Sequence, residues 1–218
     1  IITGHYGSGK TEFSVNCAMK LAKGEKRVVL ADLDIVNPYF RSREKCALLE
    51  SRGVHVVGGS TGLANLSADM PALPAEIYGF VDNTTDEIIF DVGGDGNGAR
   101  VLARFADKIA ARPYDMYLVV NANRPFTAEE AAVKDYIADI QGQSRLKING
   151  LVNNTHMLRE TSQQDIEKGA ALCRRVSEST GIPIICNVVP NYLNIQNIRS
   201  TIDKMFILDE LYMRPDWL

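Results

Sequence analysis

Short apolar runs alternate with longer stretches of helical periodicity along most of the chain. Each apolar run is short and flanked by turn-forming residues, which is typical of buried strands. We expect strands at Ile1–Ile2, Val28–Ala31, Val54–Val57, Glu87–Val92, Met116–Asn121, Ile148–Asn153 and Ile184–Val189. Helical patterns cover Glu12–Lys23, Thr127–Ile140, Ser162–Thr180 and Ile195–Met205. This alternation predicts an α/β fold, in which helices cover both faces of a mostly parallel sheet in three layers, α/β/α.

Length, charge and cysteine content narrow the class of protein. With 218 residues, 45% of them hydrophobic, the chain fits one compact domain spanning 1–218, with a few residues missing before the first strand. The net charge of -3 provides no basic field for nucleic acid or an anionic membrane. The four cysteines form no C-x-x-C pair, which indicates reduced cytoplasmic thiols. No apolar run is long enough to cross a membrane.

A glycine-rich stretch follows the first apolar residues and precedes a helical pattern. It matches G-x-x-x-x-G-K-[ST] and reads Gly4-His5-Tyr6-Gly7-Ser8-Gly9-Lys10-Thr11. Glycines allow the backbone to turn so that successive N–H groups form an anion site with the helix N-terminus. Lys10 adds a positive charge, and Thr11 supplies a hydroxyl for Mg²⁺. We therefore expect the nucleotide phosphates to be bound by Gly4, His5, Tyr6, Gly7, Ser8, Gly9, Lys10, Thr11 and Glu12.

Aspartates follow two of the predicted strands. Asp32 and Asp34 come after Val28–Ala31. Because they are two positions apart in an extended segment, their side chains point to the same side of it. Asp91 ends Glu87–Val92 and is followed by glycines, the pattern of a Walker B strand. Such an aspartate holds Mg²⁺, and Gly94 is placed to offer an N–H to a γ-phosphate. These residues predict a magnesium site formed by Thr11 and Asp91, with Asp32 and Asp34 facing the phosphates beside it.

Of three further features, the first two have two interpretations each. Asn153 closes a strand, where an amide can read an adenine edge or form a turn. The segment 39–44 carries Arg41 and Arg43 and either closes over a nucleotide or is an exposed loop. Thr127, with Glu130 three residues later, predicts a capping box at a helix start.

The order of these motifs resembles the MinD/ParA/CobQ-type nucleotide-binding domain of the SIMIBI class of P-loop NTPases, over almost the whole chain. The resemblance implies that Asp34 orients the attacking water and that Asp32 supports Mg²⁺. It also implies that Asn153 contacts adenine and that Pro190-Asn191 pass over the base.

One position departs from the family pattern. Members usually read G-K-G-G-x-G-K-[ST], and the first Lys reaches the partner's phosphates across a dimer. Here His5 stands in place of that Lys, and Tyr6 in place of the next Gly. The chain also has no cysteine between Cys46 and Cys173, so an iron–sulfur cluster is not expected.

These features favour a Mg²⁺-dependent ATP hydrolase that acts as a switch on an unknown client, with ATP and ADP as ligands and a homodimer as one possible state. Because His5 is a weaker cation than Lys, slow hydrolysis is expected without a partner. Arg41 and Arg43 are the nearest arginines to replace the missing charge. The alternatives are an ATP-dependent ligase or kinase acting on a small metabolite, resembling dethiobiotin synthetase and the cobyric-acid enzymes, and a positioning ATPase on DNA or membrane.

Overall fold

A computed structural model describes residues 1–34, 45–58, 75–82 and 85–213. Its strands form one sheet in the order β3-β2-β4-β1-β5-β6-β7-β8, and every neighbouring pair is parallel. The strands are β1 Ile2–Thr3, β2 Val28–Leu33, β3 Val54–Gly58, β4 Glu87–Val92, β5 Tyr117–Val120, β6 Gly150–Asn153, β7 Ile184–Pro190 and β8 Met205–Leu208. The predicted parallel α/β sheet is confirmed.

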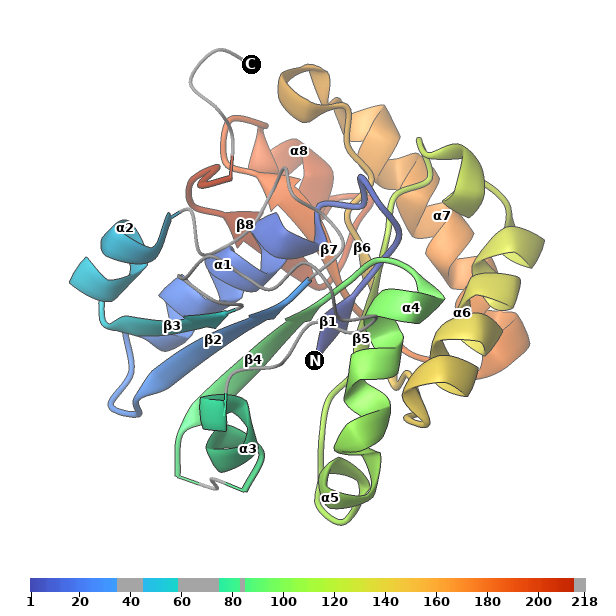
Figure 1. Cartoon of the computed structure of the whole chain (residues 1–218). Coiled ribbons are helices and arrows are strands. Elements are labelled where there is room, and N and C mark those ends of the chain that lie inside the picture. The colour runs from blue at the N-terminus through green and yellow to red at the C-terminus, as the bar shows by residue number, and fades with distance from the viewer. Residues whose placement is uncertain (35–44, 59–74, 83–84, 214–218) are drawn as a thin grey trace.

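Helices cover both faces of the sheet (Figure 1). The α-helices are α1 Lys10–Leu21, α2 Cys46–Ser51, α3 Ala75–Asp82, α4 Gly96–Ala99, α5 Ala106–Ala110, α6 Glu130–Ser144, α7 Gln163–Thr180 and α8 Ile195–Arg199. Three 3₁₀ turns, η2 Arg100–Arg104, η3 Pro125–Thr127 and η4 Leu158–Glu160, lie between them. Because all neighbouring strands are parallel, their carboxyl ends lie at one edge of the sheet, where open α/β sheets bind ligands.

The strand β2, which is apolar except at Asp32, shows why its sequence is hydrophobic on both faces. Val29, Ala31 and Leu33 pack into a core with α3, α5, α6 and α7, whereas Val28 and Leu30 pack into a second core with α1 and α2. All six residues of the strand are buried. Because alternate side chains meet a different helix layer, both faces of the central sheet select hydrophobic residues.

Two predicted helix features are wrong. Thr127 does not cap a helix: it ends η3 and its hydroxyl donates to the Asn121 carbonyl, while α6 begins at Glu130 after Glu129. The predicted helix Ile195–Met205 ends at Arg199, and the following apolar run pairs with β7 as the edge strand β8. Local periodicity did not reveal this strand because its partner is supplied by the tertiary fold.

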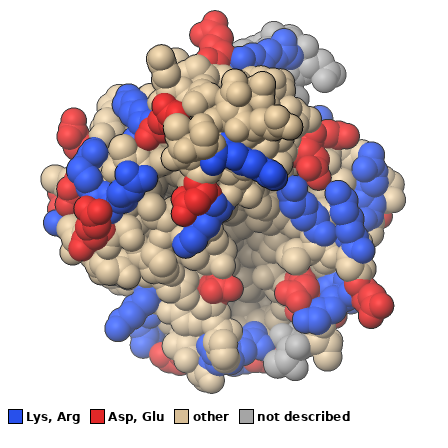
Figure 2. Space-filling model, turned by 180° about the vertical axis from the view of Figure 1, so that it is seen from behind, with Lys and Arg blue, Asp and Glu red and all other residues tan. Residues whose placement is uncertain are grey.

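Charged side chains of both signs are mixed over the face shown in Figure 2. Within the described ranges, no helix combines the length and apolarity needed to cross a bilayer.

Candidate functional site

The loop between β1 and α1 has the conformation that its glycines predict. Gly7 and Gly9 have φ angles of 77° and 79°, in the left-handed region that favours glycine. Gly9 is the N-cap of α1 and offers no side chain to the first N–H groups of the helix. The loop therefore presents a helix N-terminus and a glycine-rich backbone together, an arrangement that suits anions.

Side chains from two other strand ends hold this loop from outside. The Asn121 Nδ2 and Arg124 Nε atoms both donate to the Gly7 carbonyl, at 3.1 and 3.2 Å. Asn154 Nδ2 donates to the Ser8 carbonyl at 2.7 Å. These contacts fix two carbonyl oxygens on the outer side of the loop. The sequence analysis missed these three residues, although all three follow the ends of β5 and β6, at the ligand-binding edge of the sheet.

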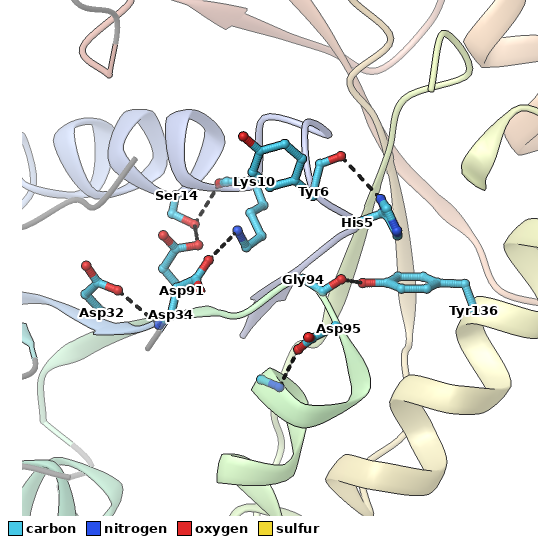
Figure 3. A network of polar contacts seen from close by, with 11 residues as sticks. His5, Tyr6, Lys10, Ser14, Asp32, Asp34, Asp91, Gly94, Asp95 and Tyr136 are labelled. Atoms are coloured by element: carbon cyan, nitrogen blue, oxygen red, sulfur yellow. Dashed lines mark hydrogen bonds and ion pairs between the residues drawn. The ribbon is translucent and has the colours of Figure 1, made fainter. Parts of the chain in front are cut away.

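Lys10 and three aspartates converge beside the loop (Figure 3). Lys10 Nζ forms an ion pair with Asp34 Oδ2 at 2.7 Å, with side chains 6% and 2% exposed. Asp32 and Asp91 are directly paired in register on β2 and β4, and both are buried. Asp32 Oδ1 also accepts the backbone N–H of Asp34 at 3.0 Å. The three predicted carboxylates thus lie together, with one lysine among them.

Burial makes this cluster electrostatically unusual. Desolvation raises the pKa of Asp91 to about 7, opposed by Lys10 and reinforced by Asp32. The pKa of Lys10 is also raised: burial alone lowers it, but the carboxylates of Asp91 and Asp34 outweigh that effect. Lys10 is therefore held charged, and the surplus negative charge around it favours a further cation.

The oxygen atoms near Lys10 suit Mg²⁺ chemically. Asp91 Oδ1 accepts from the Ser14 hydroxyl at 3.1 Å, whereas its buried Oδ2 has no hydrogen-bond partner among the described residues. The hydroxyl of Thr11 lies near enough to lower the pKa of Asp91. Mg²⁺ prefers oxygen ligands and takes few from protein, because phosphates and waters supply the rest. In the described part of the chain, no three His, Cys, Asp or Glu residues form a complete metal cage.

A pocket of about 220 Å³ extends from the loop and reaches Lys10 and Thr11. Its far wall is apolar and comes from β7, β8 and the segment after β8, with the residues Val188, Pro190, Leu208, Leu211 and Met213. Its polar wall carries Asn154, Thr155 and His156. An apolar slot next to a phosphate loop has the composition expected for a nucleobase site.

The predicted base contacts are only partly placed in this pocket. Pro190 lines it, but Asn191 is exposed and donates to the Asp209 carbonyl. Asn153 is fully buried behind the wall: its Nδ2 donates to Ile166 O and Asn187 Oδ1, and its Oδ1 accepts from Thr155. In this structure the Asn153 amide is used inside the protein, and its contact with adenine stays a prediction. The next residue, Asn154, lines the pocket instead.

Glu12 lines the same pocket, but its carboxylate holds the chain's own C-terminal segment. Glu12 Oε1 accepts the N–H of Tyr212 at 2.7 Å, and Oε2 accepts the N–H of Met213 at 2.9 Å. This connection ties the first turn of α1 to the segment that carries Leu211 and Met213 in the pocket wall. The carboxylate therefore shapes the pocket by holding its wall, and its direct contact with nucleotide stays a prediction.

The two unusual loop residues, His5 and Tyr6, have different surroundings. The ring of His5 stacks on Phe126 with centroids 4.7 Å apart and meets Tyr136 edge-on at 5.7 Å. Tyr6 is 57% exposed at the mouth of the pocket. In this structure His5 is a packing residue within its own chain. Arg41 and Arg43, with the rest of the segment 39–44, lie outside the described residues.

Comparisons with known proteins place this fold. The signal recognition particle receptor FtsY of Elizabethkingia anophelis has 18% identity and a TM-score of 0.50, covering 84% of this chain and 56% of that one. The cell division protein FtsY of Thermotoga maritima has 23% identity and a TM-score of 0.51, covering 83% and 57%. The signal recognition particle 54 kDa protein of Aeropyrum pernix K1, in complex with GDP, has 22% identity and a TM-score of 0.52, covering 84% and 39%.

At these identities the likeness concerns the fold alone, and this chain spans little more than half the length of either FtsY protein. A search of curated proteins found no match. The model of the CobQ/CobB/MinD/ParA nucleotide binding domain matches residues 1–201, and the chain therefore belongs to this family of SIMIBI-class P-loop NTPases.

Proposed function

We propose that this nucleotide-binding domain is a Mg²⁺-dependent ATP hydrolase that acts as a switch, formed by a single domain and working in the cytoplasm. The observation that carries the proposal is the buried ion pair between Lys10 and Asp34, which lies beside the phosphate loop and beside Asp91. One edge of the sheet thus holds a lysine, a carboxylate suited to orienting water and two aspartates suited to binding Mg²⁺.

The ion pair suggests how binding prepares the site. Phosphate oxygens compete with Asp34 for Lys10, since both are anions and the lysine has only three N–H donors. When Lys10 turns to the phosphates, the Asp34 carboxylate is released to accept a proton from, or orient, the attacking water. Thr11, Asp32 and Asp91 would hold Mg²⁺, which would neutralise charge on the phosphates. Binding of the nucleotide and activation of the attacking water are then linked through the pair of Lys10 and Asp34.

The choice of ATP over GTP rests on the pocket and on the sequence. Asn154, Thr155 and His156 form the polar wall beside the loop, and the chain has no N-K-x-D pattern for guanine there. A structure of similar fold was solved with GDP, so GTP is the competitor to include. We propose adenine because this polar wall carries no acidic residue of the kind that guanine readers use.

The nature of the client is the second part of the proposal. Tyr6 and Phe126 are 57% and 68% exposed next to the loop, so a protein client or a second copy would meet the site there. A phosphoryl transfer to a small metabolite is the alternative enzyme class, and a DNA- or membrane-positioning ATPase is the other. The net charge of -3 and the mixed surface in Figure 2 give no support to an anionic polymer or membrane as partner.

A titration combined with product analysis tests this proposal. The protein is titrated with ATP or GTP in the presence of Mg²⁺ in a calorimeter, and the products are then identified by mass. We expect saturable binding with ATP preferred, followed by slow formation of ADP and inorganic phosphate. Tight binding of GTP at the expense of ATP would overturn the base choice. Turnover that starts only with a metabolite and gives a phosphorylated product would favour the ligase or kinase.

A further inference from the structure

Tyr136 connects the segment after β4 to helix α6. Its hydroxyl donates a hydrogen bond to the Gly94 carbonyl at 2.7 Å. Figure 3 shows the ring reaching from α6 to Gly94, on the side of the loop away from Lys10 and the aspartates. The residue is half-buried, and desolvation raises the pKa of its phenol above the ordinary value. The hydroxyl therefore keeps its proton and acts as a donor throughout the usual pH range.

Gly94 has almost no freedom on its other side. A Cβ at this position would lie 2.6 Å from the Gly4 carbonyl oxygen and 3.1 Å from the Tyr6 nitrogen. The glycine thus lies directly against the backbone of the phosphate loop, and only the absence of a side chain permits this contact. Any displacement of Gly94 changes its distance from the site where phosphates are expected.

The residue that follows Gly94 is also fixed. Asp95 is the N-cap of α4, and its Oδ1 accepts the Gly98 N–H at 2.6 Å. The peptide group between Gly94 and Asp95 is therefore held by its carbonyl at Tyr136 and by the following side chain at α4. These two anchors hold the Gly94–Asp95 peptide, and the Gly94 N–H belongs to the peptide directly before it.

The ring of Tyr136 is itself held by the loop. His5 meets it edge-on with centroids 5.7 Å apart, and the other contact of His5 is the stacked ring of Phe126 at 4.7 Å. Tyr136 thus contacts both His5, the first variable position of the phosphate loop, and Gly94, in the segment after the Walker B strand. A change in either is transmitted to the other through direct packing.

We propose that Tyr136 is a positioning residue: by fixing the Gly94 carbonyl it restricts rotation about Gly94, and so places the N–H of the preceding peptide, that of Gly94, where the terminal phosphate of a bound triphosphate meets it. The inference rests on the proposed nucleotide-binding function and names the residue that sets its sensitivity to the γ-phosphate. Tyr136 touches neither substrate nor metal: it acts through the Gly94 carbonyl. Loss of its hydroxyl leaves the ring packing intact but frees one end of the Gly94–Asp95 peptide.

The test is the Tyr136→Phe variant, which removes the hydroxyl alone. Affinities for ADP and for a non-hydrolysable ATP analogue are measured with Mg²⁺ by calorimetry, in wild type and in the variant. We expect the preference for the triphosphate to fall by about fivefold while the affinity for ADP is unchanged, since one intramolecular hydrogen bond has a net worth of this order. Tyr114→Phe is the matched control, because its hydroxyl also contacts a backbone carbonyl, that of Lys147, away from the loop.

A second measurement guards against a general loss of structure. Hydrogen exchange of the Gly93–Asp95 amides should slow when the triphosphate analogue binds wild type, and slow much less in Tyr136→Phe. An unchanged ratio of the two affinities, or equal protection in both proteins, overturns the role of Tyr136. An equal loss of affinity for ADP and for the analogue indicates a merely structural role and also overturns it. Absence of any nucleotide binding to folded wild type overturns the proposed function itself.

Discussion

Removal of either partner of the Lys10–Asp34 pair should destabilise the protein, whereas removal of both should destabilise it much less. The pair is 2.7 Å apart and almost completely buried, so a single Lys10→Met or Asp34→Asn substitution removes the opposite charge that the remaining residue contacts. Such losses amount to about 3–5 kcal/mol in buried pairs, a large part of the roughly 5–15 kcal/mol that stabilises a typical domain. Lys10→Met/Asp34→Asn removes both charges.

The measurement is a double-mutant cycle by urea denaturation, without nucleotide or metal. We expect a coupling free energy of at least about 2 kcal/mol, because each single variant carries the cost of the charge left behind. The cycle on Lys108 and Asp82 is the matched control: this pair is also 2.7 Å apart, but its side chains are 55% and 59% exposed. Solvent screening should hold its coupling below about 1 kcal/mol.

The same variants separate folding from binding. The double variant regains stability but lacks the cation that meets the phosphates, so it should fold and fail to bind ATP. Two outcomes would refute the reasoning: additive effects of Lys10→Met and Asp34→Asn, with coupling no larger than at the surface pair, or ATP binding by the double variant at wild-type affinity.

Three further predictions concern individual side chains. Asp34→Ala should still bind ATP but hydrolyse it about 10²-fold or more slowly, as expected for a positioned acid–base group, and unchanged turnover in a phosphate-release assay would remove Asp34 from the mechanism. Because the pKa of Asp91 is raised from 3.8 to about 7 in the folded state, the folded protein binds the proton more tightly, so metal-free stability should fall as pH rises from about 4 to about 7. In Asp91→Asn the metal-free stability should not show this fall with pH. Plots of urea midpoint against pH that run parallel for the two proteins would contradict this prediction. In single-turnover hydrolysis across a dilution series, the rate per subunit should not depend on protein concentration, in wild type or in His5→Ala. A rate that rises steeply with concentration in wild type and collapses in His5→Ala would show that His5 reaches a partner's phosphates.

The sequence was sufficient to predict the elements whose chemistry is local. The phosphate loop has a complete motif, and Asp32, Asp34 and Asp91 each directly follow or end an apolar strand. Parallel strands bring their carboxyl ends to one edge, so the meeting of these residues with Lys10 could be expected before the structure was known. The helical pattern predicted over Ser162–Thr180 likewise corresponds to α7, and the structure adds a capping box between Ser162 and Asp165 at its start.

The contacts that the sequence did not reveal depend on residues far apart in the chain. Asn154 supports the Ser8 carbonyl, and Glu12 holds the backbone at Tyr212 and Met213, roughly two hundred positions away. Asn153 is a related case: its place at the end of a strand could be predicted, but the hydrogen bond from its amide to Asn187 could not. A strand-end position shows where a side chain is, but not which neighbours have already used its hydrogen bonds.

The central claim is that Lys10 and Asp34 bind and hydrolyse ATP at this loop. The most direct measurement is single-turnover hydrolysis of ATP labelled at its γ-phosphate, with Mg²⁺ and excess protein, in wild type and in Lys10→Met/Asp34→Asn. The account predicts that wild type slowly converts the label to inorganic phosphate, while the equally folded double variant releases none above the buffer rate. Equal release by the two proteins, or no release from ATP that is demonstrably bound to wild type, would contradict it.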